Sequence, residues 1–496
     1  MYVGENIIRV RVFLAGCAAA AASIGVIGTA TADSLLADAA MNGDASAVRA
    51  LVRQSADIDA AQADGMTALH WAAYLDDIEM ADALLSAGAE FGTANRTGAT
   101  PLYLATVNGS AEMLELLIDA GADANSVLTG QLETVLMLTA QTGNPEAVRL
   151  LLERGADPNA RQARNFSALM FAAAEGHAGV IELLLEHGAD PSAATLPAGE
   201  SERRPAGGMP AMLLAARQGH IDAVGALIDG GADVNQTSAD GTSPLLIALI
   251  NGHYDLAYLL LEHGADPSVT DVNGRAPLFA AIDLRNQQWA QGPAPVLPQA
   301  EHLAMIEALL AAGADASARL GGKIPHRGSF DMRWSELEEA TPFLRAAWNG
   351  DVEVMNLLLE HGADPNVVTA KGETALLLLA GAGWPLGQGY LRPDEEIMAS
   401  LDLLVEDLGM DVNAATMEGI TPVICAIFKG TNDVIRYLVE HGARLDVRDN
   451  EGRSVITWAE GIAANTGQPP RPQPESEALV RELLEQQGIT ISMLTE

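Results

Sequence analysis

The chain repeats one arrangement of small, apolar and polar positions along most of its length. In a well-formed copy, the small pair Ala172-Ala173 lies in a short apolar run, a glycine turn follows, and a second apolar stripe covers residues 180–185. Apolar residues spaced three and four positions apart are typical of helices with one buried face. Each copy therefore predicts two short antiparallel helices, and the second ends at a glycine such as Gly188, which suits a left-handed residue.

A triplet similar to Gly-Ala-Asp marks the end of each copy. The intervals between successive triplets are 33, 34, 33, 43, 33, 49, 49, 47 and 33 residues, so the base period is 33 and the longer steps contain insertions. Such self-similarity indicates repeats that stack around one continuous core. The glycines of the triplets are Gly88, Gly121, Gly155, Gly188, Gly231, Gly264, Gly313, Gly362, Gly409 and Gly442.

Several copies open with a threonine and a proline, as in Thr100-Pro101-Leu102, Thr341-Pro342-Phe343 and Thr421-Pro422-Val423. Threonine caps a helix N-terminus, and proline at the first helical position loses only an N–H that has no partner there. With the 33-residue period, these motifs resemble the ankyrin repeat over essentially all of the chain after residue 32. The resemblance implies an all-α solenoid of about twelve helix-turn-helix units with β-hairpin-like fingers, stacked in a right-angled L shape and capped at both ends.

The expected units follow the period and its interruptions. Four insertions are expected, at residues 195–205, 285–300, 320–340 and 383–396. The first unit lacks the finger and the last diverges after its start, so both are expected to be caps. The units are 33–61, 62–94, 95–127, 128–161, 162–194, 205–237, 238–270, 271–319, 320–368, 369–415, 416–448 and 449–496.

Residues 1–32 do not follow the repeat. Arg9 and Arg11 precede an uncharged stretch, residues 12–27, and residues 30–32 (Ala-Thr-Ala) resemble a small-residue cleavage site. This layout is typical of a secretory signal peptide, so we predict cleavage after Ala32 and a periplasmic or secreted chain exported from a bacterial cytoplasm. Two alternatives stay open: residues 14–17 (Leu-Ala-Gly-Cys) resemble a lipobox that would lipidate Cys17, or the stretch is an uncleaved anchor.

Charge and composition narrow the function. The 66 acidic and 28 basic residues give a net charge of −38, which repels nucleic acid and anionic membranes and favours cationic partners, although solubility alone also explains it. Cys425 lies in an apolar run and is expected to be a buried small hydrophobe, so we expect no structural disulfide. We expect a monomer whose mature chain does not insert into a membrane.

Catalytic and metal-binding motifs are missing from the sequence. It contains no H-E-x-x-H, G-x-S-x-G or P-loop motif. Eight of the ten histidines recur at fixed repeat positions, which indicates a structural role. The repeated aspartates would lie on successive layers, about 10 Å apart, too far for one cation. We therefore predict no enzyme activity, cofactor or metal.

The insertions and the exposed ends of the first helices are the candidate binding positions. Loops on a rigid scaffold often carry binding residues, and the insertion at 320–340 gathers basic and aromatic side chains on an acidic chain. The alternative is that these side chains pack onto their own solenoid. The resemblance also implies recognition through finger tips and first helices. The candidates are Tyr74, Arg217, Lys323, His326, Arg327, Phe330, Arg333, Trp334, Trp348 and Phe428, of which the aromatic Tyr74, Trp348 and Phe428 are expected to face the groove rather than the core.

These features favour an exported, non-enzymatic adaptor that holds another protein. One alternative is an accessory or inhibitory subunit of an exported enzyme, docked through the insertion at 320–340. Another is an enzyme or small-ligand binder built in the insertions, which would need converging titratable groups at 320–340 and 383–396. The fold alone does not choose among them, because function resides in sites placed on a fold.

Overall fold

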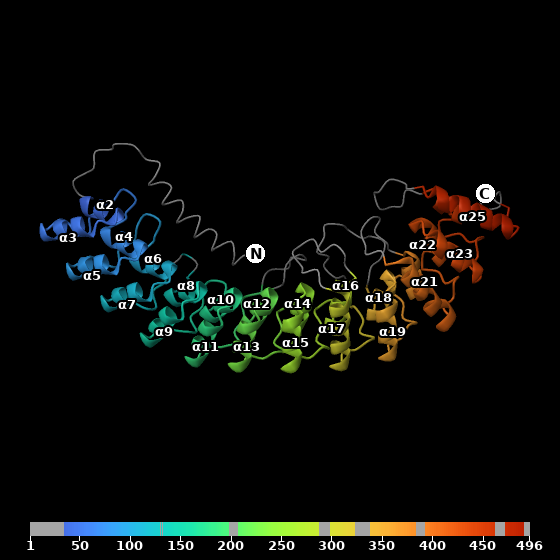
Figure 1. Ribbon diagram of the computed structural model, residues 1–496, viewed down its shortest axis with the longest axis horizontal. Helices are drawn as coiled ribbons and strands as arrows, with labels where there is room; N and C mark the ends of the chain where they lie inside the picture. The colour runs from blue at the N-terminus through green and yellow to red at the C-terminus, as the bar shows by residue number, and fades with distance from the viewer. Residues whose placement is uncertain are drawn as a thin grey trace. The chain divides into compact units, whose positions relative to one another are not determined.

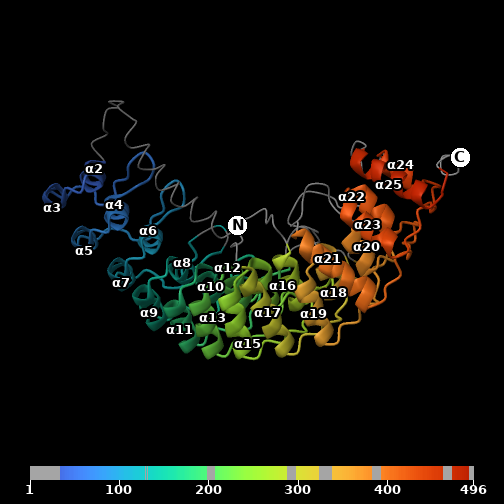
Figure 2. The ribbon, with the colours of Figure 1, turned by 45° about the vertical axis from the view of Figure 1, so that its right-hand side comes forward.

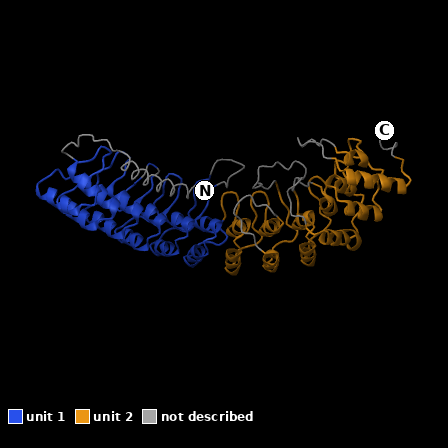
Figure 3. Ribbon diagram, turned by 45° about the horizontal axis from the view of Figure 1, so that its top comes forward, with its two compact units in different colours: residues 1–197, 207–236 blue, residues 198–206, 237–496 orange. Residues whose placement is uncertain are grey.

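The computed structural model describes residues 34–128, 130, 132–197, 207–286, 298–322, 338–382, 392–461 and 472–490. The chain forms two compact units (Figure 3): unit 1 comprises residues 1–197 and 207–236, and unit 2 comprises residues 198–206 and 237–496. The predicted signal peptide lies outside the described residues. Among the described residues there is no β-strand, only isolated bridges such as that between Val127 and Thr134, which agrees with the predicted all-α solenoid.

The described part of unit 1 contains six consecutive helix pairs. First helices pack against first helices of the neighbouring repeats, and second helices against second helices, so the pairs form two layers (Figures 1 and 2). The helices are α2 (Leu35–Met41), α3 (Ala45–Arg53), α4 (Ala68–Leu75), α5 (Ile78–Ser86), α6 (Pro101–Asn108), α7 (Ala111–Asp119), α8 (Val135–Thr142), α9 (Pro145–Glu153), α10 (Ala168–Glu175), α11 (Ala178–Glu186), α12 (Ala211–Gln218) and α13 (Ile221–Asp229).

Unit 2 also contains six helix pairs in its described part. Its first helices, which carry the even numbers from α14 to α24, again pack neighbour to neighbour. The π-helical segment η1 directly follows α21. The elements are α14 (Pro244–Asn251), α15 (Tyr254–Glu262), α16 (Pro277–Arg285), α17 (Gln299–Ala311), α18 (Pro342–Asn349), α19 (Val352–Glu360), α20 (Ala375–Ala380), α21 (Asp394–Asp402), η1 (Leu403–Asp407), α22 (Pro422–Lys429), α23 (Asn432–Glu440), α24 (Val455–Ala459) and α25 (Pro474–Gln486).

A threonine or serine side chain caps eight of the twelve first helices that the structure describes. The side chains of Thr100 and Thr341 accept from the backbone N–H three residues later, and proline follows at the first helical position. At α4 the cap is reciprocal: the Thr67 N–H donates to His70 Nδ1 at 3.2 Å, and His70 Nε2 lies 3.1 Å from the carbonyl oxygen of Ala99 in the next repeat. Among the three threonines predicted as caps, Thr421 is the exception, because its hydroxyl makes no cap hydrogen bond.

The fingers are joined to one another by single backbone hydrogen bonds. In unit 1 the N–H of Arg96 donates to the Asp64 carbonyl at 2.9 Å. In unit 2 the N–H of Met417 donates to the Lys371 carbonyl at 3.1 Å, and the N–H of Asn450 donates to the Glu418 carbonyl at 3.0 Å. Residues about 30 to 50 positions apart in the sequence therefore lie side by side along the row of finger tips within each unit.

The repeated aspartate of the triplet has a local structural role. Its Oδ1 accepts from the backbone N–H two residues later, at 2.8–2.9 Å, in eight repeats that include Asp123, Asp190 and Asp411. This hydrogen bond stabilises the turn that leads into the finger. The aspartate recurs because each repeat needs the turn, which explains the period without a bound cation.

The recurrent histidines have structural contacts, some within a helix and some between repeats. His187, His361 and His441 place Nδ1 2.8–2.9 Å from the carbonyl oxygen four residues earlier, at the C-termini of second helices. His177 and His220 place Nε2 3.0 and 3.2 Å from a carbonyl oxygen of the preceding repeat. The His177 and His220 contacts reach carbonyls in the last turns of first helices, where the helix itself offers few donors.

Candidate functional site

The candidate residues of unit 1 lie near the ends of first helices. Tyr74 is half-buried on α4 and meets Trp71 edge-on, with ring centroids 5.7 Å apart. Arg217 is half-buried at the end of α12, and burial lowers the pKa of its guanidinium. The two residues belong to different repeats, with α6, α8 and α10 between their helices. The structure therefore does not bring them into one site.

Trp348 departs from the expectation that it faces the groove. Its side chain on α18 is only 7% exposed. The guanidinium of Arg345, one turn earlier, lies 5.3 Å from its ring centroid and covers the ring, while Asp283 of α16 holds that guanidinium through a 2.7 Å ion pair. The prediction that Trp348 faces the groove is wrong. The repeat pattern predicts an exposed side chain at this position, but the charged side chain of Arg345 covers the ring.

Most of the basic insertion, residues 323–337, lies outside the described residues. Its candidates are outside the described residues, and so is most of each segment 285–300 and 383–396. Phe428 remains as the candidate that the structure places beside an opening. The residues outside the described part are Lys323, His326, Arg327, Phe330, Arg333 and Trp334.

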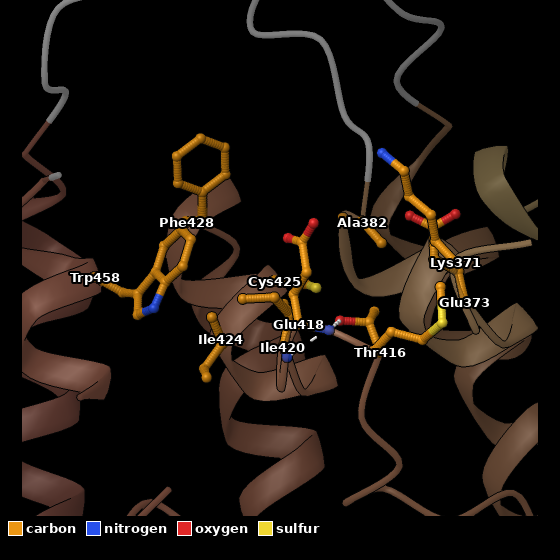
Figure 4. A pocket seen from close by; sticks show the side chains of 12 residues that line it. Lys371, Glu373, Ala382, Thr416, Glu418, Ile420, Ile424, Cys425, Phe428 and Trp458 are labelled. Atoms are coloured by element: carbon orange, nitrogen blue, oxygen red, sulfur yellow. Dashed lines mark hydrogen bonds between the residues drawn. The ribbon is translucent and has the colours of Figure 1, made fainter. Parts of the chain in front are cut away.

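Phe428 lines a pocket in unit 2 that spans three successive repeats. Its walls come from two neighbouring fingers, from the end of α20, from α22 and from α24. The space outside protein atoms is about 570 Å³, including the open mouth. Figure 4 shows the aromatic pair on one side, Lys371 and Glu373 on the other, and Glu418 between them. The lining residues are Lys371, Glu373, Gly381, Ala382, Thr416, Met417, Glu418, Ile420, Ile424, Cys425, Phe428 and Trp458.

Glu373 is a buried carboxylic acid in the wall of this pocket. It is 3% exposed, and Thr369 Oγ1 donates to its Oε2 at 2.9 Å. Burial raises the pKa of Glu373 to about 7; the Glu418 carboxylate adds to the rise, while the Thr369 hydrogen bond and the Lys371 charge oppose it. A carboxyl group in such surroundings titrates near neutral pH, and a nearby positive charge stabilises its ionised form.

The opposite wall is aromatic and apolar. Phe428 meets Trp458 edge-on, with centroids 5.8 Å apart, and Trp458 Nε1 donates to Asp449 Oδ2 at 2.9 Å. Met417, at the tip of a finger, is 68% exposed. Large apolar surfaces beside a few polar groups are typical of binding pockets.

Two further titratable groups, a thiol and an amine, lie on α22, and burial shifts the pKa of each. Cys425 is buried and unpaired with any other cysteine of the described residues, and burial raises the pKa of its thiol. The prediction that Cys425 is a buried hydrophobe is therefore confirmed. Burial lowers the pKa of Lys429 to about 8. Lys429 packs on Gly381, where an added Cβ would lie 3.1 Å from the lysine Cβ.

A second polar cluster in unit 2 is buried and structural. The carboxylate of Asp351 is fully buried and pairs with Arg285 Nε at 2.8 Å and with an Arg392 terminal nitrogen at 2.6 Å. Asn286 Nδ2 donates to the same carboxylate at 3.1 Å. Arg285 and Asn286 precede one long insertion and Arg392 follows another, so the cluster fixes their roots to α19, whose cap is Asp351.

The described residues show no metal-binding cluster of three or more His, Cys, Asp and Glu side chains. Nor, among the residues described, does any helix combine the length and apolar character that crossing a membrane requires. The histidine beside the 285–300 insertion, His302, is buried with its Nδ1 2.5 Å from the Tyr254 hydroxyl. The polar groups of this region are thus engaged with one another.

The sequence did not reveal the acidic side of the pocket. Glu373 occupies the same finger position as Arg275, Ile420 and Arg453, positions that vary in polarity from repeat to repeat. The same position holds Glu133 and Thr242 in other repeats, so a carboxylate there was no distinctive signal. Its burial and the meeting of three repeats around it depend on the stacking of the fingers.

Comparisons with known proteins agree with this architecture. A family model described as ankyrin repeats (3 copies) matches residues 36–127, 123–195 and 211–319, which is more than half of the chain. A second, ankyrin repeats (many copies), matches residues 326–378, and a third, ankyrin repeat, matches residues 418–450. The matches reach from the first described helix to the finger after α23.

Several curated proteins are similar over parts of the chain. Cyclin-dependent kinase 4 inhibitor B of Homo sapiens is 40% identical over 116 residues, 23% of this chain and 73% of the inhibitor. Alpha-latrocrustotoxin-Lt1a of Latrodectus tredecimguttatus is 29% identical over 124 residues, 25% of this chain and 8% of the toxin. Transient receptor potential cation channel subfamily V member 5 of Mus musculus is 28% identical over 151 residues, 29% of this chain and 19% of the channel subunit.

Among solved structures, the human ASB11 ankyrin repeat domain is similar, with a TM-score of 0.41 and 25% identity, over 47% of this chain and 98% of that domain. The chain spans only a small part of the toxin and of the channel subunit. Its repeats, their helix pairs and the family matches lead to one conclusion. The chain belongs to the ankyrin-repeat family.

Proposed function

We propose that this chain is a non-enzymatic adaptor, exported from a bacterial cytoplasm, that binds another protein through the pocket of unit 2. The family supports the general part, since ankyrin repeats are protein–protein interaction modules. The pocket supports the location. It offers an exposed apolar tip, an aromatic pair and two carboxylates on stacked, rigid elements. The layout of residues 1–32 supports export.

The observation that carries the proposal is the composition of the pocket. Aromatic side chains and methionine are enriched where proteins bind one another, and rigid elements present them at little entropic cost. Met417 is 68% exposed at its rim, while the rings of Phe428 and Trp458 hold each other in place. The pocket can thus accept a side chain of a partner without rearranging its walls.

Site-directed photocrosslinking tests this function. A benzoylphenylalanine residue replaces Met417 at the rim or, as a matched control, Asn356, which is exposed on the second helix α19. Both variants are expressed in the organism that encodes the protein and irradiated. We expect one defined protein to be joined to the residue at position 417 and not to the residue at position 356. Equal products from both positions, or none from position 417, would contradict a binding site at this pocket.

The predicted basic insertion is tested in the same assay. Replacing residues 322–338 by a short Gly/Ser segment leaves the pocket residues in place. Loss of the crosslink at position 417 would show that the insertion contributes to binding. An unchanged crosslink would assign binding to the pocket without it.

An inhibitory subunit of an exported enzyme is the second candidate. One relative, 40% identical over 73% of its own length, carries the name of a cyclin-dependent kinase 4 inhibitor, so this arrangement of repeats occurs in a protein named as an inhibitor. If the crosslinked protein is an enzyme, its activity with and without the purified chain distinguishes an inhibitor from an adaptor.

A further inference from the structure

We propose that the pocket of unit 2 selects a basic side chain of the partner protein, with its cation at Glu373 and Glu418 and its aliphatic stem against Phe428 and Met417. This inference rests on the proposed protein-binding function and names the chemistry that the pocket recognises. All four residues line the same pocket, and Figure 4 shows Glu418 between the aromatic side and Glu373.

Charge complementarity is the first argument. The pocket contains two carboxylates, Glu373 and Glu418, and one lysine, Lys371, in a chain whose net charge is −38. Neither glutamate takes part in the ion pairs of the described residues, whereas Arg453, on the next finger, pairs with both Asp449 and Glu451. Because the rest of the chain is also acidic, a cation that enters the pocket would be attracted to these two carboxylates.

Burial is the second argument. A carboxyl group with 3% of its surface exposed pays a desolvation cost when it ionises, and an adjacent cation offsets that cost. Thr369 provides one hydrogen bond to Oε2. An arginine or lysine head group would supply the charge that this hydrogen bond cannot. An apolar ligand would supply no such charge.

The third argument comes from the chain itself. Arg453 occupies the finger position of Glu373 two repeats later in the chain. Its guanidinium lies over the Trp458 ring, 4.8 Å from the centroid, and its Nε lies 2.5 Å from the Asp449 carboxylate. Beside the pocket, on the ring of its lining residue Trp458, the chain thus already combines an aromatic ring, a carboxylate and a guanidinium. The pocket repeats the aromatic and acidic parts of that arrangement and leaves open space where the cation would lie.

The proposal predicts pH-dependent binding. The groups that face Glu373 from the packed elements are Lys371, Glu418, Cys425 and the Thr369 hydroxyl, and Lys429 lies close by on α22. Because a cation binds the ionised form, binding should strengthen about eightfold between pH 6 and pH 7.5 for a pKa of about 7. The window stays below the range in which Lys429 loses most of its charge.

The test uses two small probes that differ in charge and little in shape. Nα-acetyl-arginine methylamide carries the guanidinium, and Nα-acetyl-citrulline methylamide replaces it by a neutral urea. Binding to the full chain is followed through the indole N–H resonance of Trp458, assigned from its loss in Trp458→Phe. We expect the arginine probe to shift this resonance and the citrulline probe to bind at least tenfold more weakly.

Variants locate the cation. Glu373→Gln should reduce binding of the arginine probe at least fivefold and remove its pH dependence. Glu418→Gln, on an exposed finger tip, should reduce binding without risk to folding. The matched control Glu360→Gln removes the same charge from an exposed position at the end of α19 and should leave binding unchanged.

The outcomes separate this inference from the function on which it rests. Equal binding of both probes, or full binding by both Glu373→Gln and Glu418→Gln, would overturn selection of a basic side chain. If the crosslink from position 417 is nevertheless formed, the protein-binding function stands and only the chemistry of recognition is wrong. If neither the crosslink nor the probe shift occurs, both proposals fail.

Discussion

Replacing Asp351 by alanine should loosen the middle of unit 2 more than any single surface change. The Asp351 carboxylate is fully buried and holds Arg285, Arg392 and Asn286 at 2.6–3.1 Å. Its Oδ1 also accepts from the Val354 N–H at the start of α19. Alanine removes every one of these interactions and leaves two buried guanidinium groups without their shared carboxylate.

The expected cost follows from what the two arginines retain. Removing one partner of a buried ion pair costs about 3–5 kcal/mol, because the remaining charge stays buried. Arg285 keeps Glu353 at 2.7 Å and Arg392 keeps Glu396 at 2.8 Å, and both acids are partly exposed, so the lower end of the range applies. We therefore expect a loss of about 3 kcal/mol, including about 1 kcal/mol for the helix cap.

Hydrogen exchange followed by mass spectrometry measures this loss locally. A loss of 3 kcal/mol in opening free energy should speed exchange about a hundredfold in peptides covering α16, α18 and α19, and should leave α6 to α10 of unit 1 unchanged. The control is Asp119→Ala, which removes an exposed acid that pairs with Arg154 and should change exchange by less than threefold. Equal exchange in Asp351→Ala and the wild type would refute the role assigned to this cluster.

Three further predictions concern individual residues. Glu373→Gln should raise the free energy of unfolding above pH 7 by about 3 kcal/mol, measured in urea titrations. The carboxyl group has a pKa of about 7 in the folded chain and about 4.5 in the unfolded chain, so the stability of the wild type falls as the pH rises between these values. The variant has no carboxyl group there and should lose this pH dependence. Cys425 should resist iodoacetamide in the folded chain and react in urea, because burial raises the pKa of its thiol; rapid labelling of the native protein would contradict this. Gly143→Ala should cost more than Gly155→Ala in thermal unfolding: both residues have φ of +84°, at a cost of about 1 kcal/mol, but only the Cβ at 143 would meet a neighbour, the His177 ring. Equal losses in melting temperature would show that the ring yields.

The repeat sequence determines the local structure because the signals are short-range. The 33-residue period, the threonine caps, the proline at the first helical position and the glycine at each helix end act within one repeat. The structure shows them where the sequence predicts them, except for the cap at Thr421. The aspartate of the triplet likewise acts through a hydrogen bond to a residue two positions away. The unit boundaries, the L shape, the leader and the partner stay predictions.

Only the tertiary structure decided which side chains became buried or brought together. Trp348 occupies a position that the repeat pattern leaves exposed, yet Arg345 and Asp283 cover it. Asp351 meets Arg285 across 66 residues and Arg392 across 41, and the Glu373 pocket draws on fingers and helices up to Trp458. These environments arise from the stacking of successive repeats. A periodic pattern specifies each repeat alone, whereas burial and charge at a site are set by its neighbours.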